Sequence, residues 1–397
     1  MKQALLIILD SVGIGHAPDA ASFGDEGANT LGHIRAMVPG FSLPNLDRAG
    51  LIAAEALAGG KEIRSDTSLS WGCLTEHSAG KDTVTGHWEL AGAPLPAPFA
   101  TFSRFPDTLV AEMEALSGVT FIGNYASSGT VILDELGEEH LRTGHPILYT
   151  SADSVIQIAA HESVIPVPAL YEICRQCRAI ADRERIGRVI ARPFVGEPGS
   201  FKRTANRHDF SMIPPMTILN RLTSIGVETI GVGKIGDIFS QSGISRSFPT
   251  GSNTEGCAVM DRVLSERFEH PRLIFTNLVD FDSLYGHRRD PVGYAKALEA
   301  FDAWFGTLLS RLDEETLLIV TADHGNDPAW RGTDHTRERV PLLVKSPGLS
   351  RCLGRRESFA DVAASLAEWF EVPKEGLAGC SFLAESRPHT KPQSHEG

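Results

Sequence analysis

The sequence predicts an α/β protein with a mostly parallel central sheet flanked by helices, plus a smaller α+β segment inserted into it. Two observations predict the sheet. Runs of consecutive apolar residues, which are typical of strands buried on both faces, recur along the chain, and helical patterns lie between them. A third observation predicts the insertion, because prolines crowd both ends of a central segment whose character differs from its flanks.

The elements of the main sheet are read from apolar patterning. The expected strands are the apolar runs Ala4–Leu9, Leu273–Val279, Leu317–Val320 and Val340–Val344. The clearest helix is expected at Pro291–Leu312, because Asp290 suits an N-cap, Pro291 suits the first helical position, and apolar residues then recur at helical spacing. A further helix is expected at Asp361–Phe370. Strands that alternate with helices indicate a sheet covered on both faces.

The chain is expected to divide into a discontinuous core, residues 1–97 and 216–397, and an inserted domain, residues 98–215. Pro94, Pro96 and Pro98 crowd the entry to the insert, and Pro214-Pro215 mark its exit. Inside it, the patterns predict a helix and short strands. They are Ala169–Arg185, Val119–Ile122 and Ile147–Thr150.

Charge excludes several classes of partner. Lys and Arg number 37 against 50 Asp and Glu, which gives a formal net charge of −13 over 397 residues. Such an acidic surface repels nucleic acid and anionic membranes, so neither is expected as a partner. A phosphate substrate would then need a local cationic cluster or bound metal.

The remaining composition predicts a soluble globular protein. Hydrophobic residues make up 42% of the chain and charged residues 22%, which is ordinary for a folded protein. No stretch reaches the ~18 consecutive apolar residues of a membrane span. Six cysteines in a chain of this length do not form a disulfide scaffold, so a reducing, cytoplasmic setting is expected.

Acids and histidines gather where the expected strands end. Ligands bind beyond the carboxyl ends of strands in open parallel sheets. One acid at such a position is an ordinary cap or turn residue, but a set of acids and histidines at one edge predicts a metal centre. The candidate ligands are Asp10, Asp282, His287, Asp323, His324 and His335. Mixed carboxylate and imidazole ligation suits Mn²⁺ or Zn²⁺, and this number suffices for two ions that clamp a phosphoryl transfer. The alternative is a set of satisfied surface histidines that bind no metal.

A polar segment, 78–89, offers a candidate nucleophile. It carries two threonine hydroxyls, Thr83 and Thr85, with little apolar periodicity around them. A threonine hydroxyl is a weak nucleophile until a metal or a base activates it. The alternative is a Ser/Thr-rich loop that leads into a helix N-cap. Residue chemistry alone does not choose between the two threonines.

Several segments together resemble the bacterial phosphopentomutase family, which belongs to the alkaline-phosphatase-like metalloenzyme superfamily. The segments are 10–15, 80–83, 86–89, 151–154, 157–162, 280–282, 286–288, 321–327 and 333–338. They occur in the family's order from residue 4 to about residue 345. The metal motifs are shared across the superfamily. The segments 80–83 with 86–89, and 151–154 with 157–162, point to this family in particular.

The resemblance implies an alkaline-phosphatase-like core with a cap domain, two Mn²⁺ ions and a nucleophile. One ion would be held by Asp282, His287 and His335, and the other by Asp10, Asp323 and His324. Related mutases place a Ser or Thr three residues before a Gly-His pair, which is Thr83 here. The implied activity is an isomerase that interconverts ribose 1-phosphate and ribose 5-phosphate, and the 2-deoxy sugars. It would proceed through phosphorylated Thr83 and a 1,5-bisphosphate, with a sugar bisphosphate as a possible activator.

The resemblance also implies residues that bind the pentose phosphate. Asp153, with Ser151 nearby, is the expected contact to the ribose hydroxyls from the cap. Arg207 is the first candidate for the distal phosphate and Arg203 the second, because arginine forks grip phosphate in bidentate fashion. Lys234, in a glycine-rich turn after a strand-like run, is a further candidate. The alternative for these three cations is a solvated surface position.

Two other functions stay open at this point. One is a different metal-dependent phosphoryl-transfer enzyme of the same superfamily, such as a phosphatase, a phosphodiesterase or a phosphoglycerate mutase. The other is a non-catalytic protein that binds metal or sugar phosphate. The intact acids and histidines at every matched position argue against the second.

Overall fold

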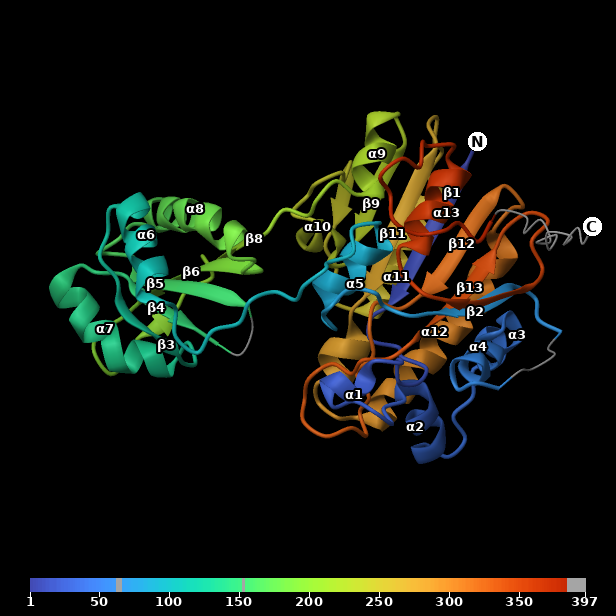
Figure 1. Cartoon of the computed structure of the whole chain (residues 1–397), viewed down its shortest axis with the longest axis horizontal. Helices are drawn as coiled ribbons and strands as arrows, with labels where there is room; N and C mark the ends of the chain where they lie inside the picture. Colours follow the sequence, from blue (N-terminus) through green and yellow to red (C-terminus); the bar gives the residue numbers. More distant parts are fainter. Residues whose placement is uncertain (62–65, 152–153, 384–397) are drawn as a thin grey trace, which may run out of the picture. The chain divides into compact units, whose positions relative to one another are not determined.

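The computed structural model describes residues 1–61, 66–151 and 154–383, and its chain forms two compact units (Figure 1). The core unit comprises Met1–Pro96 and Pro214–Gly397, and the inserted unit comprises Ala97–Ile213. Each has its own sheet and its own buried apolar side chains. No helix in the described ranges combines the length and the apolar character that crossing a bilayer requires.

The core unit is built on a sheet with the strand order β10-β9-β11-β1-β12-β13-β2-β14 in the described part of the chain. The strands are β1 (Gln3–Leu9), β2 (Ser70–Leu74), β9 (Glu228–Val232), β10 (Arg246–Phe248), β11 (Arg272–Leu278), β12 (Thr316–Thr321), β13 (Val340–Lys345) and β14 (Cys352–Arg356). The stretch from β10 to β12 is parallel throughout. β13 runs antiparallel to both of its neighbours. Every residue of β1, β11 and β12 is buried, which explains their continuous apolar sequences.

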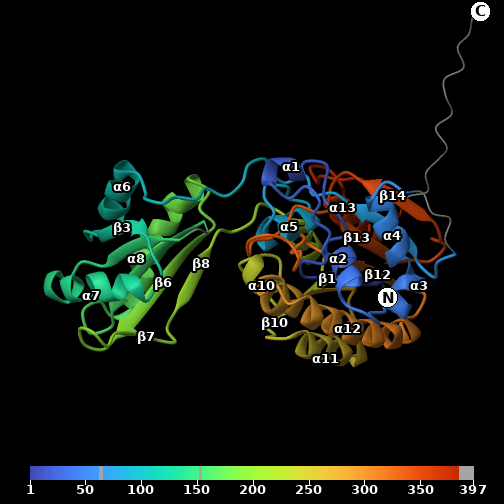
Figure 2. The ribbon, with the colours of Figure 1, turned by 90° about the horizontal axis from the view of Figure 1, so that it is seen from below.

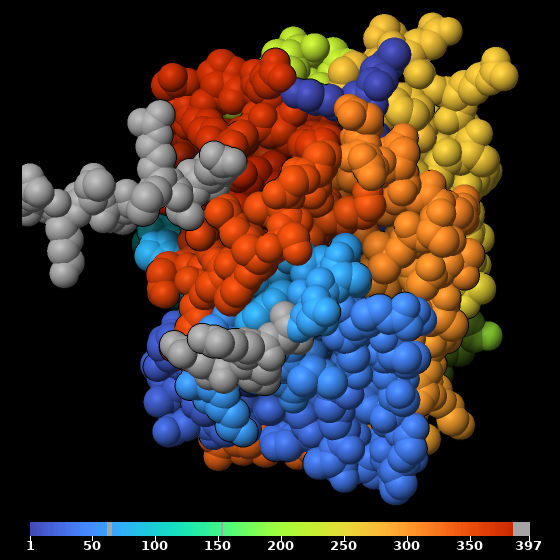
Figure 3. Space-filling model, turned by 90° about the vertical axis from the view of Figure 1, so that its right-hand side faces the viewer, coloured from blue at the N-terminus to red at the C-terminus, as the bar shows by residue number. Residues whose placement is uncertain are grey.

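Helices cover both faces of this sheet. They are α1 (Ala20–Phe23), α2 (Thr30–Met37), α3 (Pro44–Ala49), α4 (Leu51–Ala58), α5 (Thr83–Leu90), α9 (Ile218–Ser224), α10 (Ile235–Ile238), α11 (Asn253–Ser265), the π-helix η1 (Phe281–Gly286), α12 (Pro291–Arg311) and α13 (Asp361–Trp369). In Figure 2, α11 and α12 lie on one side of the core sheet and α13 lies on the other. Figure 3 shows N-terminal segments, in blue, side by side with later segments, in orange and red. Within the core unit, α3 packs on α12, and α4 packs on β13 and β14.

The strands and helices expected for the core are confirmed to within a few residues. The antiparallel direction of β13 has a consequence for function. Since β13 runs against β12, it begins at the edge where β12 ends, and the bridge between Gly325 and Thr336 joins the two connecting segments there. The segment before β13 therefore reaches the same sheet edge as the parallel strand ends.

The inserted unit is an α+β sandwich. Its strands are β3 (Ile122–Ala126), β4 (Ile147–Thr150), β5 (Val155–His161), β6 (Arg188–Val195), β7 (Lys202–Arg203) and β8 (His208–Ser211), and its helices are α6 (Asp107–Ser117), α7 (Val131–Thr143) and α8 (Val167–Arg183). The strand order is β3-β4-β5-β6-β7, with β8 paired to β6. Apolar side chains of α6 and α8 pack on one face of this sheet, and those of α7 pack on the other. The expected helix and the strand at Ile147–Thr150 are confirmed.

The expected strand Val119–Ile122 is wrong, because β3 begins only at Ile122. The residues before it form the connection from α6, which ends at Gly118 in the left-handed conformation. The Phe121 amide donates to Glu114 Oε1 at 2.8 Å, and the Val119 and Phe121 side chains pack on the core under α6 and α8. Apolar alternation here reflects a packed connection rather than a strand.

Candidate metal centre

Three parallel strands deliver the acids of the site to one edge of the core sheet. β1 lies between β11 and β12, with Leu9 opposite Leu278 and Ile8 opposite Thr321. Asp10 directly follows β1, Asp323 follows β12 by two residues, and Asp282 lies in η1 just beyond β11. The shared register brings their carboxylates together. We call the set Asp10, Asp282, His287, Asp323, His324 and His335 the ligand edge.

The first group in the ligand edge is Asp10, Asp323 and His324, whose potential ligand atoms all lie within 4.8 Å of one another. All three residues are at most 1% exposed. His324 Nε2 lies 3.4 Å from Asp10 Oδ1 and 3.3 Å from Asp323 Oδ2. This group has the membership that the resemblance implied.

The second group is Asp282, His335 and again His324, so His324 belongs to both groups. His335 Nε2 lies 3.5 Å from Asp282 Oδ1, and His287 Nε2 lies 3.2 Å from Asp282 Oδ2. His287 is therefore adjacent to Asp282 but outside the tight group. Its Nδ1 donates to the Thr333 carbonyl oxygen at 2.7 Å, and His324 Nδ1 donates to the Gly325 carbonyl oxygen at 3.1 Å. Both bonds leave Nε2 as an acceptor that faces the carboxylates.

The donor set fits divalent metal ions. Asp10 Oδ1, Asp323 Oδ2 and His335 Nε2 are buried and have no hydrogen-bond partner among the described residues. Buried polar atoms are normally paired, so these three converging acceptors form a site suited to a cation. Burial, reinforced by the neighbouring Asp323 carboxylate, raises the pKa of Asp10. Burial would also raise the pKa of Asp323, but the nearby His324 and His87 rings lower that pKa to about 2.

Amide groups hold the carboxylates in place. Asn326 Nδ2 donates to Asp282 Oδ1 at 2.7 Å, and the Ser11 amide donates to Asp323 Oδ1 at 3.1 Å. Asp10 Oδ2 accepts from Asn277 Nδ2 at 3.1 Å. Sequence reasoning did not single out these three residues. The signal for Asn277 was present, since it is an amide inside the largely apolar run of β11.

Lys234, expected as a phosphate contact, lies beside the ligand edge of the core unit. Its Nζ donates to Asp10 Oδ2 at 3.2 Å. Burial opposes the charged form of this amine, but the Asp10 and Asp282 carboxylates outweigh burial and raise the pKa of Lys234. A persistent positive charge therefore lies next to the acids, where it can meet both carboxylate and phosphate oxygens.

The two candidate threonines lie in the first turn of α5 and differ in surroundings. Thr83 Oγ1 lies 3.1 Å from His324 Nε2. Thr85 is fully buried, and its Oγ1 accepts from the Asp82 amide at 3.2 Å as one half of a capping box with Asp82. Its hydroxyl also donates to the Asp82 carbonyl oxygen at 2.8 Å. Thr83 thus faces the histidine shared by both groups, whereas Thr85 supports the helix start.

Two residues of α5 hold Thr83 against the ligand edge. His87 Nδ1 donates to the Thr83 carbonyl oxygen at 2.8 Å and lies 3.1 Å from Asp323 Oδ2. A Cβ atom at Gly86 would lie 2.1 Å from the Asp323 carbonyl oxygen, so only glycine permits this approach of helix and strand end. The Gly-His pair of the motif therefore sets the position of Thr83 relative to Asp323.

The four residues of the inserted unit that were expected to contact the sugar phosphate differ in where the structure places them. Ser151 directly follows β4, and Asp153 lies outside the described residues. Arg203 is exposed on β7. Arg207 already forms a bidentate ion pair with Asp209, with Nε–Oδ1 and Nη2–Oδ2 distances of 2.7 Å each.

A third arginine, Arg192 of β6, joins this region and was not expected. Its Nε donates to Gln157 Oε1 at 3.1 Å. Burial raises the pKa of the Tyr149 hydroxyl, and the charges of Arg192, Arg203 and Arg207 oppose that rise, which places all three cations around one tyrosine. We call these three residues the arginine cluster. A charged residue within the apolar run of β6 was the available signal.

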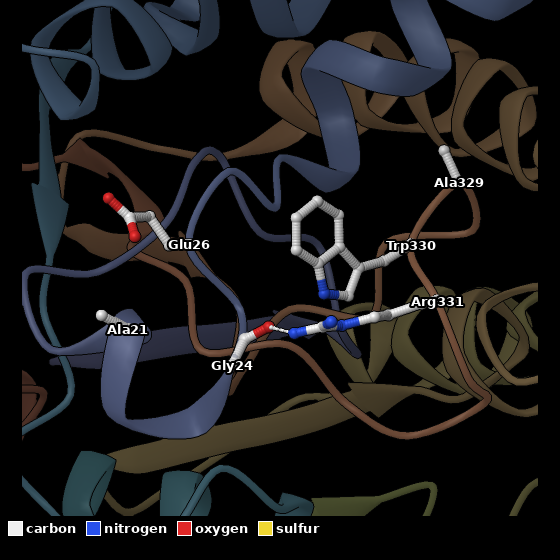
Figure 4. Close-up of a pocket in the computed structure, with 6 residues that line it drawn as sticks. All are labelled: Ala21, Gly24, Glu26, Ala329, Trp330 and Arg331. Carbon is white, nitrogen blue, oxygen red and sulfur yellow. Dashed lines mark hydrogen bonds between the residues drawn. The ribbon is translucent and has the colours of Figure 1, made fainter.

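A separate pocket of the core unit contains none of the predicted site residues. It is lined by Ala21, Gly24, Glu26, Ala329, Trp330 and Arg331 (Figure 4). Arg331 Nη2 donates to the Gly24 carbonyl oxygen across it at 2.7 Å. One acid and one base line this pocket, without converging ligand atoms.

The sequence matches the family model of the Metalloenzyme superfamily over residues 2–374. It is 49% identical over 388 residues to the phosphopentomutase of Syntrophotalea carbinolica, covering 96% of this chain and 97% of the relative. It is 50% identical over 396 residues to the phosphopentomutase of Caldanaerobacter subterraneus, covering 97% and 98%. The chain belongs to the phosphopentomutase family. The expected isomerase class is thereby confirmed.

Solved structures agree with the fold. The PH0037 protein of Pyrococcus horikoshii matches with a TM-score of 0.51 at 16% identity, covering 95% of this chain and 99% of that one. A Leishmania mexicana phosphoglycerate mutase also matches with a TM-score of 0.51, at 14% identity, covering 96% and 97%. The expected α/β core with a mostly parallel sheet is confirmed. At such low sequence identities, these two structures support the fold and nothing more specific.

Proposed function

We propose that the protein interconverts ribose 1-phosphate and ribose 5-phosphate, and the 2-deoxyribose equivalents, with Thr83 as the phosphoryl carrier. The observation that carries the proposal is the 3.1 Å distance between Thr83 Oγ1 and His324 Nε2, at the residue common to both candidate ligand groups. The family relationship supports the reaction, and the capping role of Thr85 supports the choice of threonine.

We propose two Mn²⁺ ions at the ligand edge. Asp10, Asp323 and His324 would hold one, and Asp282, His287 and His335 the other, with His324 close to both groups. When bound, the ions supply Lewis-acid stabilisation of the charge on the transferring phosphoryl group. The buried orphan acceptors support this occupancy.

Both phosphoryl transfers of the reaction use the same side chain, Thr83. Phosphorylated Thr83 gives its phosphoryl group to the 5-hydroxyl of sugar 1-phosphate. The bond from phosphorus to Thr83 Oγ1 breaks, a bond to the sugar oxygen forms, and the hydroxyl proton passes to Thr83. The resulting 1,5-bisphosphate then returns its 1-phosphate to Thr83, and the proton goes back to the sugar. A trace of sugar bisphosphate would activate the enzyme by phosphorylating Thr83.

The residues around Thr83 suit a group that alternates between hydroxyl and phosphate. Thr83 is the first residue of α5, and the helix N-terminus stabilises negative charge there. His87 holds the Thr83 carbonyl oxygen, so the side chain keeps its direction through both states. Lys234 adds a nearby cation.

We propose that the inserted unit binds the sugar phosphate. Ser151 and Asp153 would contact the ribose hydroxyls, and Arg203 and Arg207 would contact the distal phosphate, with Arg192 as an added member of that cluster. A mutase must offer the phosphoryl group to a sugar and not to water, so a unit that covers the sugar would also exclude water.

Pentose phosphates would be the partners, and nucleic acid would not. The charge of −13 supports this choice. We further propose a cytoplasmic location. All six cysteines are free, which suits a reducing compartment.

The test is a product analysis by ³¹P NMR. Purified protein with Mn²⁺, ribose 1-phosphate and a trace of ribose 1,5-bisphosphate should yield ribose 5-phosphate, with phosphorylated Thr83 detected by mass spectrometry. Release of inorganic phosphate as the main product, or phosphorylation at another residue, would contradict the proposal.

A further inference from the structure

Glu338 is a buried carboxylate that the proposed reaction does not use. It lies three residues after His335, in the segment that leads into β13, and is 1% exposed. Oε1 accepts from the Thr30 and Thr336 hydroxyls, each at 2.7 Å. Oε2 accepts from the Thr30 amide at 2.9 Å and from the Gly15 amide at 3.1 Å. No lysine or arginine is among these partners in the described part of the chain.

The partners of Glu338 come from three separate segments. Gly15 belongs to the loop after β1 that begins with Asp10, Thr30 begins α2, and Thr336 directly follows His335. A carboxylate that accepts four hydrogen bonds without an ion pair acts as a junction between backbone segments.

The backbone of the ligand edge also packs directly on this side chain. A Cβ atom at Gly13 would lie 2.2 Å from Glu338 Oε2, and one at Gly325 would lie 2.4 Å from Oε1. Gly325 follows His324 and exchanges two backbone hydrogen bonds with Thr336, at 3.2 and 2.8 Å. Glu338 thus contacts the residue after each of two candidate ligands, as well as the loop after Asp10.

We propose that Glu338 is a positioning residue for the metal centre, which fixes the spacing of His324, His335 and the Asp10 loop without touching the metal. The proposal rests on the proposed ligand role of those residues. Partners behind the ligands of metal sites typically change metal affinity by about 10–100-fold when removed.

Two substitutions distinguish the hydrogen bonds of Glu338 from the effect of filling a buried position. Glu338→Ala removes all four acceptors and leaves the donors of Gly15, Thr30 and Thr336 unpaired. Glu338→Gln keeps the shape. Its carbonyl oxygen can face the two fixed amides, while its NH₂ group faces the two hydroxyls, which can rotate to accept.

The experiment is calorimetric titration of metal-free protein with Mn²⁺, alongside thermal melting of the same samples. Leu308→Ala, which opens a cavity at a fully buried position of α12, is the control for lost stability. We expect Glu338→Ala to weaken Mn²⁺ binding by roughly 10-fold or more. Glu338→Gln should stay within about threefold of the wild type, and so should Leu308→Ala at a comparable drop in melting temperature.

Unchanged Mn²⁺ affinity in Glu338→Ala, or an equal loss in Leu308→Ala, would overturn this proposal alone. Failure of the wild type to bind Mn²⁺ would overturn the proposed metal centre with it. Should Glu338→Ala not fold, Thr30→Val decides, because it removes one hydroxyl donor to Oε1 and keeps the shape. Weaker Mn²⁺ binding in that variant supports the junction, and unchanged binding overturns it.

Discussion

The ligand edge of the core unit and the arginine cluster of the inserted unit differ in how far their charged groups are exposed to solvent. Asp10, Asp323 and His324 are at most 1% exposed. The Arg203 and Arg207 side chains reach solvent, and Arg207 already has an acidic partner in Asp209. Charges of the first kind are expensive to bury, whereas charges of the second kind cost little.

The difference decides how far geometry can identify function. A buried acid persists only where something compensates it, so unpaired atoms such as Asp323 Oδ2 indicate a site suited to a cation. An exposed arginine needs no such reason. The role of such an arginine must be established by binding measurements.

The largest effect is expected at Thr83. Thr83→Ala should reduce mutase activity by at least about 10³-fold, because no other hydroxyl takes its place as the covalent carrier. Thr85→Ala should keep most activity and lose about 1 kcal/mol of stability, because it removes one half of the capping box. Turnover of ribose 1-phosphate and melting temperature measure both. A Thr85→Ala enzyme that is dead while Thr83→Ala turns over would move the nucleophile to Thr85.

Metal removal is the next test, and it should affect activity and stability together. Chelator-treated protein should lose activity, and added Mn²⁺ should restore it. The melting temperature should rise with Mn²⁺, since a ligand at about 100 times its Kd stabilises the folded state by about 2.7 kcal/mol. Asp282→Asn, which lowers the negative charge of the second group, is the matched variant and should show a smaller rise. Full activity after complete metal removal would contradict the proposed metal-binding role of the ligand edge.

The sequence predicted the ligand edge because strand ends follow from apolar runs. Once Ala4–Leu9 and Leu317–Val320 are parallel neighbours, Asp10 and Asp323 must meet. Asn277 was missed although its amide lies among the apolar residues of β11. Ser11 was missed because it adopts a left-handed backbone, with φ 74°, that no sequence period indicates.

The inserted unit was less predictable than the core unit, because its expected phosphate contacts are exposed to solvent. Its exposed arginines follow no burial pattern, so the pairing of Arg207 with Asp209 could not be foreseen. Arg192, which is half-buried within β6, was missed although its charge interrupts an apolar run. The strand β3 begins later than apolar alternation indicated, because Val119 and Phe121 pack from a connection. Packing in an irregular segment imitates the alternation of a strand.

A pH titration of stability measures the cost of one buried acid. Burial raises the pKa of Glu338 from 4.5 to about 7, against the hydrogen bonds from Thr30 and Thr336 that lower it. Folding then takes up a proton between these two pH values. The stability linked to Glu338 is complete below pH 4.5 and falls as the pH rises toward 7.

Glu338→Gln lacks this proton uptake. The free energy of unfolding of Glu338→Gln minus that of the wild type should grow by roughly 3 kcal/mol between these pH values. Urea unfolding of both metal-free proteins at several pH values measures it. Parallel curves would show that the four donors keep the carboxyl at its ordinary pKa.

The smallest effect is expected in the arginine cluster. Arg203→Met should raise the KM for ribose 1-phosphate about tenfold with little change in kcat, because a charge-assisted hydrogen bond to phosphate contributes about 1.5 kcal/mol. Arg207→Met should act similarly, and Asp209→Asn, which releases the Arg207 fork, should raise the KM less. Phosphorylation of Thr83 by ribose 1,5-bisphosphate at saturation serves as the control and should be unaffected. An unchanged KM in both arginine variants would show that Arg203 and Arg207 are solvated surface charges, and Arg192 would then be the next residue to substitute.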